Sequence, residues 1–202
     1  MSDQDLQIVS REVCYEGFYR LERIALRHRL FAGGMSPVIT REIIEKGDVA
    51  AVLLYDPRRD EVVMIEQFRI GARDDPRGPW LLEIVAGLIE PGETPDQVAR
   101  REALEEAGCT VIDLVPVNTF YVSPAKTSQR TWLYCGRVDA SRAGGVHGLP
   151  HEGEDIRVVR LSAEDALALV GQGRADSAWP LIALLWFARE REALRARWIA
   201  GG

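Results

Sequence analysis

Hydrophobic and charged residues alternate in the first fifty residues of the chain. Within residues 15–31, Ile24, Leu26 and Leu30 alternate with arginines. A repeat of two residues is typical of a strand that has one exposed face. A pair of glycines then marks a turn, and a further strand is predicted to end at Gly47. The N-terminal segment is therefore predicted to form a small sheet.

The next part of the chain also has the pattern of strands. Two apolar runs flank the turn sequence at residues 56–60, so residues 50–69 are predicted to form a hairpin. A loop at 74–79 separates this hairpin from the apolar run 80–87, which is predicted to be a strand. Further strands are predicted at 111–124, 131–138 and 156–161, with a polar loop at 139–155 before the last of them.

A helix is predicted to follow the strand at 80–87. Thr94 is a suitable N-cap, Pro95 suits the first helical position, and Gln97 completes a capping box. Gly108 is placed to end the helix in a left-handed cap. The order of strands, helix, strands and helices predicts a mixed α/β fold with helices packed on a sheet. The last two helices are predicted at 162–171, capped by Ser162, and at 179–198.

Three carboxylates share one face of the predicted helix. Glu102, Glu105 and Glu106 are spaced i, i+3, i+4, so their side chains are neighbours. Because like charges repel, a divalent cation is the natural partner, and carboxylate oxygens suit Mg²⁺ or Mn²⁺ better than zinc. The same acidic run would otherwise be read as an exposed helix face. Small residues that would let the helix approach a sheet closely form a neighbouring stripe: Ala99, Ala103 and Ala107.

Composition disfavours nucleic-acid-binding, membrane-associated and disulfide-rich classes of protein. The chain has 202 residues, 47% of them hydrophobic, and a net charge of −6, with a pI of about 5.2. The acidic balance disfavours nucleic acid as a partner. No leader-like segment and no apolar run of membrane-spanning length is present, so no membrane association is expected. The three widely separated cysteines suggest neither a disulfide framework nor a metal site, and they suit a reducing cytoplasm.

The sequence GLIEPGETPDQVARREALEEAGC at residues 87–109, here called the box, resembles the signature of the Nudix hydrolases. The resemblance extends over nearly the whole chain to bacterial ADP-ribose pyrophosphatases, through residues 11–31, 123–130 and 136–158. It implies an α/β/α sandwich around a mixed sheet at 48–202. It also implies an N-terminal antiparallel strand layer at 1–47 that serves in homodimerisation. Whether the two subunits would exchange these strands stays open.

The resemblance also implies an active site. Glu102 and Glu106 are expected to bind the metal directly, and Glu105 to bind the metal or a water on it. The backbone carbonyl of Ala86 is expected to complete a metal's coordination shell. The loop at 139–155 matches the family's catalytic loop, with Glu152 at the position of the general base and Glu154 as the alternative. Arg101 and Glu93 are expected to pair and to hold the box in shape.

The expected substrate is a nucleoside diphosphate sugar. Arg69 is expected to contact its diphosphate or its adenine, and Ser123 to lie near the distal ribose. Phe18 and Arg41 are expected to reach the purine from the partner subunit, since an aromatic ring and a guanidinium can clamp a planar base. Without the resemblance, both arginines would be read as exposed strand residues.

Two departures from the family concern the segment after Pro124, and they bear on the substrate more than on the reaction class. Lys126 stands where the family has a Gly-rich turn, and Gln129 stands where it has a glutamate that could act on metal or water. The expected reaction is Mg²⁺-dependent hydrolysis of ADP-ribose to AMP and ribose 5-phosphate. The alternatives are hydrolysis of another nucleoside diphosphate sugar, such as GDP-mannose, and ADP-ribose sensing without cleavage.

Overall fold

The structure is a computed structural model that describes residues 5–201, apart from the side chain of Glu152. The chain divides into two compact units. The first comprises the N-terminal residues up to Asp48 together with the segment 121–130. The second comprises residues 49–120 and the remainder of the chain from Thr131.

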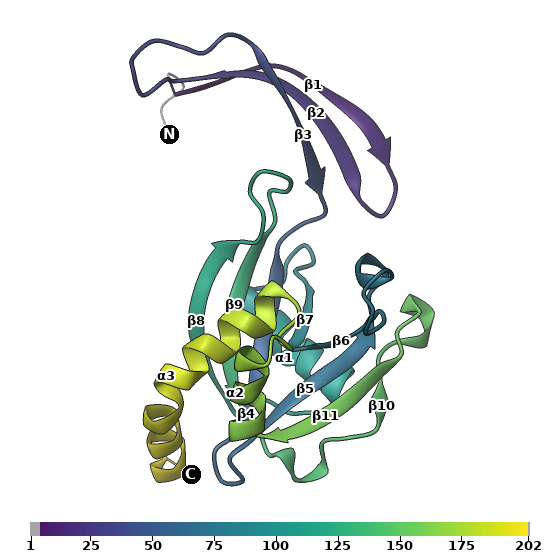
Figure 1. The fold of residues 1–202 in the computed structure, drawn as a ribbon, viewed down its shortest axis with the longest axis vertical. Coiled ribbons are helices and arrows are strands. Elements are labelled where there is room, and N and C mark those ends of the chain that lie inside the picture. Colours follow the sequence, from purple (N-terminus) through teal and green to yellow (C-terminus); the bar gives the residue numbers. More distant parts are fainter. Residues whose placement is uncertain (1–4, 202) are drawn as a thin grey trace. The chain divides into compact units, whose positions relative to one another are not determined.

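The first unit is built on an antiparallel sheet of three strands in the order β1-β2-β3 (Figure 1). These strands are β1 (Leu6–Glu16), β2 (Arg20–His28) and β3 (Ile39–Glu45). The alternation seen in the sequence therefore marks real strands. The segment 121–130, which the sequence assigned to the other part of the chain, joins this unit through a bridge between Ile44 and Thr127.

The three-stranded sheet has little core of its own. Val9 and Tyr15 of β1 are 58% and 62% exposed, and Phe18 in the following turn is 66% exposed. A single layer of strands cannot bury both of its faces, which makes such a sheet only marginally stable by itself. These apolar residues on a long edge strand are the kind of surface that another chain can cover.

The second unit is centred on an eight-stranded mixed sheet with the main order β10-β11-β5-β4-β9-β8. β4 and β9 are parallel, whereas β4 and β5 are antiparallel. The strand predicted at 80–87 is two strands: β6 pairs with β5 and β7 pairs with β4. The bounds are β4 (Val49–Asp56), β5 (Glu61–Phe68), β6 (Trp80–Glu83), β7 (Val85–Leu88), β8 (Asp113–Tyr121), β9 (Arg130–Arg137), β10 (Val146–His147) and β11 (Ile156–Ser162).

Helices cover both faces of this sheet, as the α/β/α expectation requires (Figure 1). On one side lies α1 (Pro95–Ala107), and on the other lie α2 (Ala163–Gly171) and α3 (Ala178–Ala200). None of the described helices is long and apolar enough to cross a membrane. The loop predicted at 139–155 contains β10 and two short 3-10 helices. The described 3-10 helices are Ile70–Ala72, Ala140–Arg142 and Pro150–Glu152.

The central strand β4 belongs to two cores at once. All eight of its residues are buried. Ala50, Val52 and Leu54 pack in the core beneath α1, whereas the intervening residues pack in the core beneath α2 and α3. Successive side chains of a strand point to opposite faces, so the part of β4 that lies between the helices, residues 49–55, is apolar at every position.

A buried tyrosine and an ion pair fasten α3 to the turn after β4. Tyr55 is fully buried, and its hydroxyl donates to Asp60 Oδ1 at 2.7 Å. Arg191 of α3 donates to the same carboxylate from Nε at 3.0 Å. The hydrogen bond from Arg191 is the main reason that the pKa of Asp60 lies below its usual value. Asp60 has a left-handed backbone with φ of 57°, which asparagine also tolerates.

We predict that Asp60→Asn lowers the free energy of unfolding at neutral pH by about 1.5 to 3 kcal/mol, because a charge-assisted hydrogen bond is lost. A depressed folded-state pKa stabilises the fold above the unfolded pKa of about 4, and this contribution disappears as the pH falls through the folded value. Urea denaturation from pH 7 to pH 3 should therefore show the two proteins converging in acid. Asp74→Asn, at a carboxylate that is 85% exposed, serves as the control. A constant difference at every pH would contradict the prediction.

Candidate functional site

The helix of the box begins and ends where the sequence predicts. The predicted capping box is present: the Thr94 amide donates to Gln97 Oε1 at 2.9 Å, and the Thr94 side chain accepts from the Gln97 backbone. The Thr94 hydroxyl also donates to Asp96 Oδ1 at 2.7 Å. Gly108 ends α1 with φ of 62°, a left-handed conformation that glycine adopts without strain. These caps fix which residues of α1 face the sheet.

A close approach between α1 and β7 places two of the predicted carboxylates beside the strand backbone. The Ala86 amide donates to Glu106 Oε2 at 3.0 Å. A Cβ atom at Gly87 would overlap the carboxylate of Glu102. Ala103 and its neighbours in the alanine stripe are fully buried, as the sequence predicts. The structure thus brings Glu102 and Glu106 together at Ala86–Gly87, and it needs a glycine to do so.

Arg101 supplies countercharge to the glutamates of the box. Its Nε donates to Glu93 Oε1 at 2.9 Å, which is the predicted pair between loop and helix. A single nitrogen of the same guanidinium also donates to Glu102 at 2.7 Å and to Glu105 at 2.9 Å. The sequence did not reveal these two further contacts. A fork-shaped cation with five N–H donors can bind several carboxylates at once, which a lysine cannot do in the same geometry.

Burial disfavours the ionised forms of Glu102 and Glu106. Glu106 is 3% exposed, and this burial raises its pKa well above the usual value, with a further rise from the charges of Glu102 and Glu154. Burial likewise raises the pKa of Glu102, although the charge of Arg101 opposes the rise. Arg69 opposes the rise at Glu106 in the same way. Glu154 and Arg69, both named from the sequence, therefore lie within electrostatic range of Glu106.

The donor set of this site suits a hard cation. Among the described residues, no three acidic, histidine or cysteine side chains are gathered in a ready-made metal site, since Glu102 and Glu105 turn oxygens toward Arg101. Glu106 is nevertheless buried and Glu102 half-buried, and the charge of Glu102 disfavours ionisation of Glu106. The Glu102 carboxylate occupies the space that Gly87 leaves open. Carboxylate and carbonyl oxygens in such a place are ligands for Mg²⁺ or Mn²⁺.

Glu83 is a residue of the site that the sequence reasoning missed. Its side chain is 5% exposed, and its Oε2 accepts from Arg69 Nε at 2.7 Å. Its Oε1 accepts from the Ser177 hydroxyl, between α2 and α3, at 3.1 Å. Glu83 therefore fixes the direction of Arg69. The available signal was a lone acidic residue inside the otherwise apolar run Trp80–Val85.

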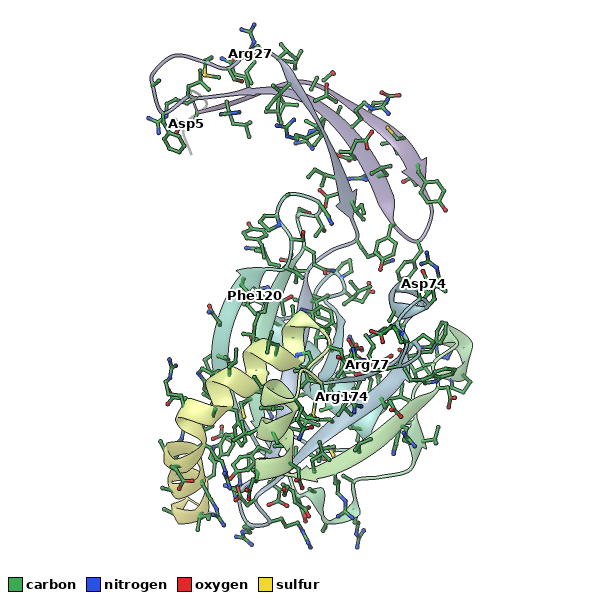
Figure 2. The ribbon with its side chains drawn as sticks, in the orientation of Figure 1. Asp5, Arg27, Asp74, Arg77, Phe120 and Arg174 are labelled. Atoms are coloured by element: carbon green, nitrogen blue, oxygen red, sulfur yellow. The ribbon has the colours of Figure 1, made fainter. Side chains whose placement is uncertain are left out.

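A second arginine ties the loop after β5 to the same connection between helices. Arg77 forms an ion pair with Asp176 at 2.7 Å and donates to the Gly173 carbonyl at 3.3 Å. Figure 2 shows Arg77 near the labelled Arg174 of that connection. The segment that follows Arg69 is thus held at both ends rather than left as a free loop.

The loop at 139–155 is attached to the C-terminal end of α1. The Gly148 amide donates to the Glu105 carbonyl at 3.3 Å. A Cβ atom at Gly108 would come within 2.7 Å of the His147 ring, so the glycine that ends the helix also leaves room for the loop. Glu154 Oε2 accepts from the Leu149 amide at 2.9 Å. The side chain of Glu152 lies outside the described residues, and its role stays a prediction.

The remaining predicted substrate residues belong to the first unit, so their contribution to a site at the box stays a prediction. The Phe18 ring packs edge-on against Tyr19 at 4.9 Å between centroids, and Lys46 Nζ lies 3.8 Å above it. Arg41 donates to the neighbouring Thr40 carbonyl at 2.8 Å. The Ser123 carbonyl accepts from two backbone amides of the turn that follows it.

Comparison with known proteins assigns the chain to a family. ADP-ribose pyrophosphatase of Escherichia coli strain K12 is 50% identical over 194 residues, covering 96% of this chain and 93% of that protein. ADP-ribose pyrophosphatase of Haemophilus influenzae is 43% identical over 200 residues, covering 98% and 92%. GDP-mannose pyrophosphatase of Pectobacterium atrosepticum is 29% identical over 195 residues, covering 91% and 97%. The model of the NUDIX domain matches residues 45–181. Since this match covers more than half of the chain and includes the whole box, the protein belongs to the NUDIX domain family.

Proposed function

We propose that this protein hydrolyses the diphosphate of ADP-ribose to AMP and ribose 5-phosphate with the help of Mg²⁺. The observation that carries the proposal is the near full-length similarity, at 50% identity, to a protein named ADP-ribose pyrophosphatase. The site agrees with it, because the box carboxylates lie beside Ala86 and within electrostatic range of Arg69. A divalent cation and a guanidinium both stabilise the negative charge of a diphosphate.

Glu102, Glu106 and the Ala86 carbonyl would hold the cation, with Glu105 beside it. When bound, Mg²⁺ or Mn²⁺ supplies Lewis-acid stabilisation of the charge on the diphosphate. The buried carboxylates favour cation binding because burial and mutual repulsion leave them short of positive charge. With the cation bound, Arg101 retains its ion pair with Glu93, and this pair holds the loop of the box against the helix.

The other residues orient the substrate and move a proton. Glu83 occupies Nε of Arg69, which directs the remaining N–H groups of that guanidinium for the diphosphate. Glu152 accepts the proton from the attacking water, with Glu154 as the alternative base. Attack at the adenosyl-side phosphorus releases AMP. A carboxylate carried by a loop allows substrate binding to control the chemistry.

The first unit is proposed to pair two chains into a homodimer in which Phe18 and Arg41 of one subunit reach the purine bound to the other. The exposed apolar residues of β1 support this proposal. A sedimentation experiment that finds only monomer at micromolar concentration would contradict it.

The three free cysteines, two of them buried, fit a cytoplasmic protein, which cell fractionation can test.

The alternatives differ in their substrate or in lacking catalysis. GDP-mannose is the main rival substrate, since a more distant relative carries the name GDP-mannose pyrophosphatase. A module that senses ADP-ribose without cleaving it is disfavoured because all the box carboxylates are present.

With Mg²⁺, we predict that ADP-ribose is turned over with a kcat/KM at least about tenfold higher than those of GDP-mannose and NADH, a difference of about 1.4 kcal/mol in transition-state binding. Chromatography of the products should show AMP and ribose 5-phosphate in equal amounts. A higher kcat/KM for GDP-mannose would identify that compound as the substrate instead. Binding of ADP-ribose without formation of any product would establish the sensing alternative.

We predict that Glu106→Gln and Glu102→Gln each lower kcat by about three orders of magnitude or more, since each removes a cation ligand worth several kcal/mol in the transition state. Their urea denaturation should show no loss of stability, because a neutral amide is easier to bury than a carboxylate. Glu192→Gln, an exposed glutamate of α3, is the matched control. A kcat for Glu106→Gln within a factor of three of the unmodified protein would refute the cation site.

We predict that Glu152→Gln lowers kcat by about 10²- to 10⁴-fold, as loss of a general base does, while KM changes by less than about threefold. Glu154→Gln tests the alternative in the same steady-state assay. If only Glu154→Gln shows the large loss in kcat, then Glu154 is the base. If neither variant does, the loop does not carry the base.

A further inference from the structure

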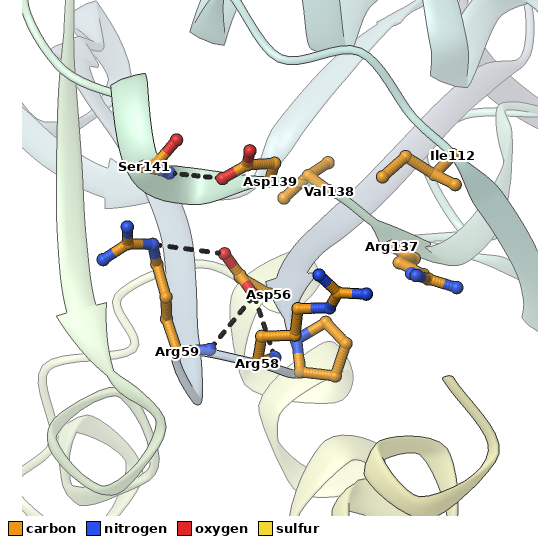
Figure 3. A pocket seen from close by; sticks show the side chains of 9 residues that line it. Asp56, Arg58, Arg59, Ile112, Arg137, Val138, Asp139 and Ser141 are labelled. Carbon is orange, nitrogen blue, oxygen red and sulfur yellow. Dashed lines mark hydrogen bonds and ion pairs between the residues drawn. The ribbon is translucent and has the colours of Figure 1, made fainter. Parts of the chain in front are cut away.

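A cavity lies at the end of β4, in the turn that leads into β5. Its volume is about 440 Å³, within the range of sites that hold small molecules. Asp56 at the strand end, Arg58 in the turn and Arg137 at the end of β9 line it (Figure 3). Ser141 of the following 3-10 helix and Ile112 complete its wall.

The carboxylates of this cavity are directed at the backbone. Asp56 is 4% exposed, and its Oδ1 accepts from two amides of the turn at 2.9 and 3.1 Å. Its Oδ2 accepts from the Ala140 amide at 2.9 Å. Asp139 Oδ1 likewise accepts from the Ser141 amide at 2.9 Å. Both acidic groups therefore serve to fold the cavity wall, and most of the hydrogen-bonding capacity of Asp56 is used there.

The arginines give the cavity its chemical character. Three guanidiniums line it against two carboxylates, although the chain as a whole has a net charge of −6. Arg59 lies 3.7 Å from Asp56 and balances that charge. In the part of the chain that the structure describes, the guanidinium of Arg137 makes no hydrogen bond or ion pair. Figure 3 shows the Arg58 side chain extending from the turn toward the strand end that carries Arg137.

We propose that this cavity binds the phosphate group of a small phosphorylated molecule. Guanidiniums match the geometry of phosphate oxygens and bind them in pairs of hydrogen bonds. Ser141 also lines the cavity, and its hydroxyl provides a further donor. Ile112, which is 55% exposed, and the Pro57 ring provide an apolar wall for the rest of the ligand.

The cavity is distinct from the site at the box. Ala51 of β4 pairs with Ala86, beside the box carboxylates, whereas Asp56 is five residues further along the strand. At about 3.3 Å per residue, these positions are about 16 Å apart. An occupant of the cavity therefore does not compete for the box carboxylates, and its binding can be measured separately.

The proposal can be tested by titrating the full-length protein with inorganic phosphate, at constant ionic strength and without divalent cation, while amide signals are followed by NMR. We expect the amides of Ser141 and Ile112 to shift with a saturable dependence. Arg58→Gln and Arg137→Gln should each weaken this binding at least about tenfold. Arg189→Gln, whose side chain is 73% exposed on α3, is the matched control and should leave the affinity unchanged.

A second titration with AMP distinguishes free phosphate from a larger phosphorylated ligand. If the apolar wall is used, AMP should bind more tightly than phosphate, and Ile112→Ser should weaken AMP but not phosphate. Equal affinities that Ile112→Ser leaves unchanged would identify free phosphate as the ligand. The proposal is overturned if the Ser141 amide does not shift, if shifts are confined to Ala86 and Gly87, or if Arg58→Gln and Arg189→Gln behave alike. The wild-type amide pattern elsewhere shows that each variant is folded.

Discussion

The close approach of α1 to β7 is the contact on which the rest of the site depends. The buried alanine stripe, with Ala103 at its centre, brings the helix against the sheet, and Gly87 leaves the space that the Glu102 carboxylate occupies. A side chain at position 87 would displace the Glu102 carboxylate, and a larger residue in the stripe would separate the two elements. The Ala86 amide would then lose Glu106, whose carboxylate would remain buried without that donor.

The negative charges of this site are each placed next to a particular arginine or backbone amide. Arg101 contacts three glutamates, and Glu83 restrains Arg69, so each buried acid has a definite cationic or backbone partner. Burial nevertheless raises the pKa values of Glu102 and Glu106, so a positive charge beside these carboxylates would be stabilising. This is what a site for an additional cation requires.

Local patterns were sufficient to predict most elements of the fold. Alternation located β2, the turn residues located the hairpin of β4 and β5, and Gly108 located the end of α1. The break between β6 and β7 was missed because it depends on partner strands, β5 and β4, that are remote in sequence. For the same reason, the sequence did not place the segment 121–130 with the N-terminal strands.

The candidate site was predictable to the same degree. The spacing of Glu102 and Glu106 on a capped helix placed them together, because helical geometry is local. The contacts of Arg101 with Glu102 and Glu105 depend on side-chain rotamers, and the contact of Glu83 with Ser177 joins residues that are 94 positions apart. No periodicity in a single sequence encodes such pairs.

Because β4 packs in both hydrophobic cores, the changes in sequence that it can accept are restricted. A one-residue insertion or deletion between Val49 and Asp56 would send every following side chain to the opposite helical layer. Small residues would then lie where the core is packed by larger ones, and larger residues would lie where the core has room only for small ones. A substitution in β4 affects only the core that its side chain enters, whereas a change in length would disturb both cores together. Related proteins should therefore differ in length at the loops and not in this strand.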